Sequence, residues 1–246
     1  MEQPTSFSST FTLTRFGVIL GASIIVAASI VAGTLYKIRE FDNTLSVTGS
    51  AKQKITSDTV KWIGGFSRAV ALTDLRAGYV QMKNDEKIVA QFLKTNGVAP
   101  ESIILSPVFV DQPNRYDANA PQQYGLRQTV EVKSTDVKKI SALTSALQPL
   151  IDQGVIFATQ SLDYYYTNLP AMRVQLLSQA VRDGQDRASK IAQSTGKKVG
   201  SLKSASVGVV QVMPVDSTDV NDYGTYDTSS IDKEVMVTVK AVFRLE

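Results

Sequence analysis

The chain has 246 residues, with 26 Lys and Arg against 23 Asp and Glu, and it contains neither Cys nor His. The absence of Cys excludes disulfides, thiolate metal sites and a cysteine nucleophile, and the absence of His excludes a Ser-His-Asp triad and the commonest zinc ligand. Residues 41–246 carry 23 basic and 21 acidic side chains, a balance that gives no overall field for nucleic acid or an anionic membrane surface. We therefore expect no metal, no cofactor and no nucleic-acid partner.

The first apolar segment is the most informative part of the chain. Residues 1–15 are rich in Ser and Thr and are predicted to form a disordered tail. Residues 16–36, FGVILGASIIVAASIVAGTLY, contain no charged residue and no Pro. A helix of this length spans about 30 Å, the thickness of a bilayer's hydrocarbon core. The segment is longer than the apolar core of a signal peptide, and no small-x-small site follows it. We expect an uncleaved single-pass transmembrane anchor, with a cleaved signal peptide as the alternative.

Two further features of this segment concern its contacts and its orientation. Gly17 and Gly21 form a G-x-x-x-G pattern, which lets two membrane helices approach closely, although the pattern is also frequent by chance in apolar segments. Arg15 precedes the segment and Lys37 and Arg39 follow it, so the flanking charges do not orient the helix.

Residues 41–246 are treated as one domain, and the pattern of their apolar residues predicts its elements. Two extended segments fall within residues 44–70, where Gly64 and Gly65 indicate a bulge or a close backbone approach. Trp62 is predicted to lie in the core. The elements expected next are a helix over residues 72–95 with Thr73 as its N-cap, strands over 101–110 and 124–133, a short helix capped by Ser134 or Thr135, a strand over 155–166, a long helix over 170–195, and strands over 207–213 and 234–245.

The order of these elements predicts the fold class. In the long helix, apolar residues recur at steps of three and four and predict a buried face of Val174, Leu177, Val181, Gly184, Ala188 and Ile191. About seven strands with three helices grouped between them predict an α+β domain: a mainly antiparallel sheet with the helices on one face, preceded by one transmembrane helix.

Two segments are weighed as candidate sites. Tyr164, Tyr165 and Tyr166 could form an aromatic surface for a protein partner, or they could alternate between core and solvent. The loop over residues 214–232 carries five Asp and no basic residue before Asp232. Because it lacks the residue order of a calcium loop, we interpret it as a solvated acidic loop.

Several strings, in this order and spacing, resemble the SIMPL-domain family, long catalogued as a domain of unknown function. They are SVTGSAKQKITSDTVKW, LKTNGVAPESIILSPVFV, SQAVRDGQDRASKIAQSTGKKVG and the closing EVMVTVKAVFRLE. The Pro-Pro-Asp turn usual in that family is here Thr56-Ser57-Asp58. The resemblance implies an exported α+β domain without established catalytic residues, and relatives that assemble into ring-like oligomers.

Together these observations predict a non-enzymatic envelope protein that is anchored in the inner membrane through residues 16–36. Its C-terminal domain is expected in the periplasm or outside the cell, as a homo-oligomer with a role in stress tolerance or envelope scaffolding. The alternatives are a ligand-binding module with a pocket between sheet and helices, and an enzyme that works without His and Cys.

Overall fold

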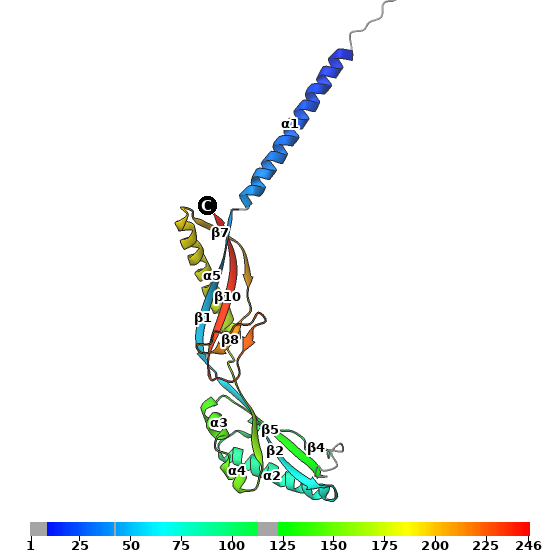
Figure 1. The fold of residues 1–246 in the computed structure, drawn as a ribbon, viewed down its shortest axis with the longest axis vertical. Coiled ribbons are helices and arrows are strands. Elements are labelled where there is room, and N and C mark those ends of the chain that lie inside the picture. The colour runs from blue at the N-terminus through cyan, green and yellow to red at the C-terminus, as the bar shows by residue number, and fades with distance from the viewer. Residues whose placement is uncertain (1–8, 42, 113–122) are drawn as a thin grey trace, which may run out of the picture. The chain divides into compact units, whose positions relative to one another are not determined.

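The computed structural model describes residues 9–41, 43–112 and 123–246. The chain divides into two compact units, each built from segments that are far apart in the sequence. Unit 1 comprises Met1–Gly49, Val181–Ser206 and Val239–Glu246, and unit 2 comprises Ser50–Ala180 and Val207–Thr238. Four elements, labelled in Figure 1, contribute residues to both units: strands β1, β7 and β10 and helix α5.

Helix α1, Ser9–Phe41, opens the described chain. It contains the predicted apolar segment and is longer than that segment at both ends, so Ser9–Arg15 are helical. The rest of the predicted tail, residues 1–8, lies outside the described residues. The side chains of residues 15–37 are exposed or half-buried throughout, so the described chain buries none of this apolar span.

Unit 2 contains an antiparallel five-stranded sheet, in which β2 and β5 are central. Its strands are β2 (Thr59–Ala71), β3 (Ile103–Leu105), β4 (Phe109–Asp111), β5 (Gln123–Ser134) and β6 (Phe157–Tyr165). The predicted bulge is confirmed, because the β2–β6 register shifts between Ile63 and Gly64. The single strand expected over residues 101–110 is instead β3 and β4, which pair with different parts of β5 on either side of Pro107.

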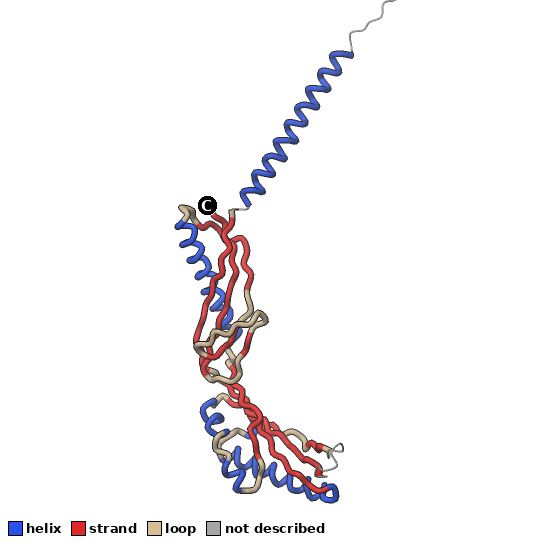
Figure 2. Tube along the Cα trace, in the orientation of Figure 1, coloured by secondary structure: helices blue, strands red, loops and turns tan. Residues whose placement is uncertain are grey.

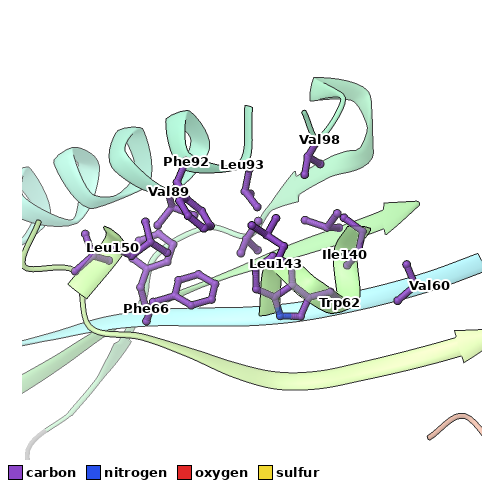
Figure 3. Packing of buried hydrophobic residues seen from close by; sticks show 14 of the residues in the cluster. Val60, Trp62, Phe66, Val89, Phe92, Leu93, Val98, Ile140, Leu143 and Leu150 are labelled. Carbon is purple, nitrogen blue, oxygen red and sulfur yellow. The ribbon is translucent and has the colours of Figure 1, made fainter. Parts of the chain in front are cut away.

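Three helices cover one face of this sheet: α2 (Leu75–Thr95), α3 (Val137–Thr144) and α4 (Gln148–Asp152). Trp62 is fully buried in the core between them, as predicted, together with Phe66, Leu93 and Ile140 (Figure 3). The predicted caps were wrong. Thr73 lies in a 3₁₀ turn, Leu72–Asp74, before α2, and the Asp136 carboxylate caps α3 by accepting a hydrogen bond from Lys139 N.

A second five-stranded sheet is built around β10 (Asp232–Leu245), which pairs with β1 (Thr44–Thr56) on one side and with β7 (Val199–Val207) and β8 (Gln211–Pro214) on the other. The two-residue β9, Thr225–Tyr226, adds to β8 in parallel orientation. The long strands of this sheet and helix α5 (Leu169–Ser194) can be followed in Figure 2.

Helix α5 buries a stripe that lies beside the predicted one. The buried residues are Leu169, Met172, Leu176, Ala180, Gly184, Ala188 and Ala192. Val174 and Ile191, which were predicted to be buried, are 66% and 47% exposed. Small residues line much of the buried stripe, and Gly184 lies next to the Gly49 backbone, where an added Cβ would make an ordinary contact at 3.5 Å from Gly49 N. Helix α5 therefore packs partly on Ala and Gly, beside larger side chains that stay exposed.

The α+β class is confirmed, but its details differ from the prediction. The described residues form two five-stranded sheets and five α-helices including α1, rather than one sheet of seven strands and three helices behind the anchor. Alternation identifies a strand without saying which sheet it joins. Here β1 and β2, separated only by Ser57 and Asp58, belong to different sheets.

Candidate functional site

The part of α1 between Arg15 and Lys37 has the length and composition of a membrane span. Its 23 residues rise about 35 Å, enough for a hydrocarbon core of about 30 Å. Its polar side chains are satisfied within the helix: the hydroxyls of Ser23, Ser29 and Thr34 donate to the carbonyls four residues earlier at 2.7–2.8 Å. Such internal bonds suit a helix in lipid, where no water is present to replace them.

The structure leaves the G-x-x-x-G surface of α1 open. A Cβ added to Gly17 or Gly21 would meet no atom of the described chain within 4 Å. Neither glycine is therefore required by packing within the chain. Contact with a second helix at Gly17 and Gly21 stays a prediction.

The three consecutive tyrosines do not form one surface. Tyr164 is buried in the core of unit 2, and its hydroxyl shares a 2.9 Å hydrogen bond with Ser141 Oγ. Tyr165 is half-buried, with its ring centroid 6.1 Å from that of Tyr226. Tyr166 is half-buried against the apolar cluster under α5. Tyr165 and Tyr226 are thus the partly exposed pair, and a partner-binding role for the tyrosines stays a prediction.

Asp58 holds together the segments that connect strands in unit 2. Its carboxylate accepts hydrogen bonds from Thr167 N at 3.0 Å and from Thr167 Oγ1 at 2.7 Å. Its own N–H donates to the Tyr165 carbonyl at 3.0 Å. Asp58 therefore fixes the start of β2 to the turn before α5. This role is structural.

A buried ion pair lies where a solvated acidic loop was expected. Lys233 is fully buried, and its Nζ donates to the Asp227 carbonyl at 2.5 Å and lies 3.4 Å from Asp227 Oδ2. The Asp227 carboxylate also accepts hydrogen bonds from the N–H and hydroxyl groups of Ser229 and Ser230. Sequence reasoning missed this pair, although Lys233 shares the inward register of Val235 and Val237 in β10.

The surroundings set the pKa values of this pair. Burial lowers the pKa of Lys233, and Asp227 opposes that shift. Burial alone would raise the pKa of Asp227, but the hydrogen bonds from Ser230 and Ser229 and the charge of Lys233 outweigh it and hold the pKa well below its ordinary value. Both side chains are therefore occupied by internal partners, which indicates a structural pair rather than a reactive one.

A second ion pair was also missed. Asp85 is almost fully buried on α2 and accepts two hydrogen bonds from the Arg68 guanidinium, at 2.5 and 2.7 Å. Arg68 also donates to the Gly154 carbonyl at 3.1 Å. The hydrogen bond to Asp85 raises the pKa of Arg68 despite some burial. The signal was present in the sequence, since Asp85 falls in the apolar stripe of Met82 and Val89.

Two cavities in unit 2 differ in chemistry. One, of about 450 Å³, lies between α2 and α4 and is lined by apolar and amide side chains, including Phe92, Pro149 and Gln153. The other, of about 520 Å³, has a mixed lining that includes Lys133 and Lys139 beside Val98 and Ile140. Among the described residues, no group of three or more acidic side chains could hold a metal ion. The large core side chains, rather than a cavity, fill the space between Trp62 and the helices (Figure 3).

Comparison with known proteins agrees with this architecture. No curated protein matches the chain. The model of the SIMPL family, described as a protein of unknown function (DUF541), matches residues 45–243, which covers both sheets and every helix except α1. The chain therefore belongs to the SIMPL family.

Proposed function

We propose that this protein is a membrane-anchored, exported envelope protein that acts without catalysis, by self-assembly. The observation that carries the proposal is the uncovered apolar span of α1, joined directly to a SIMPL domain. An apolar helix that the protein leaves exposed requires another apolar environment, and a bilayer supplies one. In this proposal the domain lies in the periplasm or outside the cell, where it contributes to stress tolerance or envelope scaffolding.

A non-catalytic role is supported by the way in which the ionisable groups in the interior of unit 2 are used. Lys233 and Asp227 bind each other, and Asp85 binds Arg68. A catalytic acid or base needs access to a substrate and a proton that it can exchange. These side chains are instead tied to internal partners and stabilise the connections between elements.

Self-assembly is supported by an exposed strand edge. Strand β10 is not available for pairing with a neighbouring chain, because it is paired on both sides. In the described residues, β7 pairs only with β10, and its side chains from Ser201 to Val207 are exposed. An edge strand of this kind is a template for pairing with another chain.

The anchor is tested by membrane extraction. We expect the full chain to stay with membranes after carbonate washing, and a variant without residues 1–40 to be released. In intact spheroplasts, added protease should digest the domain. N-terminal sequencing that began beyond Gly33 would show a cleaved signal peptide instead, and protection from protease until lysis would show the opposite orientation.

Assembly is tested by the mass of the full chain in detergent, measured by sedimentation equilibrium. We expect a mass well above the 26.7 kDa of one chain. Lys198 and Glu246 exchange two backbone hydrogen bonds, so the N–H of Lys198 points toward the strand that contains β10. Successive N–H groups along a strand alternate in direction. Because Ser201 follows Lys198 by an odd number of residues, its N–H points away from β10. Ser201→Pro removes that outward donor and should weaken assembly, whereas Ser201→Thr should not.

The same measurement distinguishes contact through the membrane helix. If Gly17→Leu/Gly21→Leu dissociates the oligomer while Ala22→Leu does not, α1 carries the contact. A 26.7 kDa particle for the unmodified chain would end the assembly proposal.

A further inference from the structure

The basic side chains are segregated between the two units. The part of unit 1 that follows α1 comprises residues 42–49, 181–206 and 239–246 and carries eight Lys and Arg against four Asp and Glu. Unit 2 carries 15 basic against 17 acidic side chains. The near-neutral balance of the whole domain therefore hides a surplus of four positive charges in this part of unit 1 and a surplus of two negative charges in unit 2.

The basic unit is the one joined to the membrane helix by a short connection. The apolar span ends at Lys37, α1 ends at Phe41 and β1 begins at Thr44. Four helical residues rise about 6 Å, and three further residues reach at most about 11 Å. The headgroup layer on each side of a bilayer is about 5–8 Å thick. The start of β1 is thus held within about 10 Å of the headgroups, close to the Debye length of about 8 Å at physiological salt.

Hydrogen bonds bring several basic residues to this end of unit 1. Asn43, the residue before β1, accepts a hydrogen bond from Leu245 N at 2.9 Å and another from Lys197 Nζ at 3.1 Å. Lys198 exchanges two 2.8 Å backbone bonds with Glu246. Lys197 and Lys198 are exposed, and so is Lys240 farther along β10.

The acidic side chains of this unit offset part of that charge. Asp183 and Asp186 lie on α5, and Asp183 is engaged by Arg187 at 2.8 Å. Glu246 lies at the end of unit 1 where Lys197 and Lys198 are found, and Asp42 precedes Asn43 in the sequence. A positive surface held at about one Debye length from a bilayer attracts anionic lipids.

We propose that the basic side chains of unit 1, with Lys197 and Lys198 at the end next to α1 and Lys240 farther along β10, bind the anionic phospholipid headgroups of the membrane that holds α1. The proposal rests on the anchoring proposed above. The covalent connection selects lipid among possible polyanions, because it keeps a bilayer within reach at all times. Binding of headgroups restrains the domain against the membrane surface, which α1 alone does not do.

The test uses the full chain in lipid nanodiscs. Because the chain has no native Cys, a fluorophore attached at Gln193→Cys, an exposed position on α5, is unique. Nanodiscs are made of phosphatidylcholine with or without phosphatidylglycerol, and both contain a lipid with a spin label on its headgroup. The spin label quenches the fluorophore only at short range. We expect stronger quenching with phosphatidylglycerol, and loss of the difference when salt shortens the Debye length to about 3 Å.

Charge reversal supplies the matched comparison. Lys198→Glu/Lys240→Glu changes unit 1, and Lys87→Glu/Lys94→Glu changes exposed positions of α2 in unit 2 by the same total charge. We expect the first variant to lose more than about half of the phosphatidylglycerol-dependent quenching, since each basic side chain near an anionic surface changes binding about fivefold. The second variant should keep it. Circular dichroism confirms that both variants are folded.

Each outcome decides one of the two proposals. Quenching that does not depend on phosphatidylglycerol, or that both variants reduce equally, would overturn the headgroup contact while leaving the anchor intact. Failure of the full chain to enter nanodiscs of either composition would instead contradict the anchoring itself.

Discussion

Replacement of Lys233 by Ala is expected to lower the free energy of unfolding by about 3–5 kcal/mol, because it breaks a buried ion pair and empties the space that the lysine fills. Lys233 is fully buried at the start of β10, with its Nζ on the Asp227 carbonyl at 2.5 Å. Removing it leaves the Asp227 carboxylate without its cation. Arg68→Ala should also be costly, because the Asp85 carboxylate that it leaves without a cation is only 2% exposed.

The measurement is urea unfolding followed by the fluorescence of Trp62, the only tryptophan in the chain and part of the core of unit 2. Lys94→Ala is the matched control, because Lys94 is exposed on α2 and its loss should change the free energy of unfolding by no more than about 0.5 kcal/mol. An unchanged urea midpoint for Lys233→Ala would show that the ion pair does not stabilise unit 2.

The same pair gives unfolding a predictable dependence on pH. The pKa of Asp227 is depressed in the folded state, so its contribution is present above the ordinary value of 3.8 and is lost as pH falls below that value. The pKa of Lys233 is also lowered, so between its folded value and 10.5 the unfolded chain binds more protons and stability rises with pH. Asp227→Asn should make the acid loss smaller. An equal loss in that variant would assign acid unfolding to other carboxyl groups.

The elements that could be predicted from sequence are those in which one face is buried and the other is exposed to solvent. The alternation of β5, with Leu126, Val130 and Val132 buried, identified the strand and its inward face. Gly64 marked the register shift between β2 and β6, because a strand interior rarely contains Gly without a reason. In each case the local pattern and the tertiary environment agree.

The assignment of strands to two sheets could not be read from periodicity. It depends on Ser57 and Asp58, where a hydrogen bond from Ser57 N to the Ile231 carbonyl and the Asp58–Thr167 contacts redirect the chain. These bonds join residues more than 100 positions apart. The edge position of β7 was missed for a related reason: its exposed side chains lack the alternation by which strands are recognised.

The buried charges were missed because charge was taken to mean solvent exposure. Lys233 and Asp85 each occupy a position in an otherwise apolar stripe, and that register was the available signal. A charged residue in such a stripe predicts a buried partner, since an unpaired charge there would be too costly. The partner itself, Asp227 or Arg68, became identifiable only in the folded structure.

Gly64→Ala is expected to destabilise the protein by up to about 3 kcal/mol through overpacking. A Cβ at Gly64 would overlap the ring of Phe157 on β6. That ring is itself fixed, with its centroid 5.7 Å from that of Trp62 and 6.5 Å from that of Phe66. Phe157 therefore moves only by displacing the two largest side chains of the core. The shift in the urea midpoint, again followed by Trp62 fluorescence, reports the cost.

Two further variants test whether the clash with Phe157, rather than any substitution in β2, causes the loss of stability. Gly65→Ala should cost much less, because the added Cβ would meet only the amide end of Gln160, an exposed and flexible side chain that can turn away. Phe157→Leu removes the ring edge, so Gly64→Ala should be less harmful in that background, with a favourable coupling of about 0.5–3 kcal/mol. If the effects of Gly64→Ala and Phe157→Leu simply add, the ring of Phe157 is not what requires glycine at position 64. The close approach of β2 and β6 at the bulge would then need another cause.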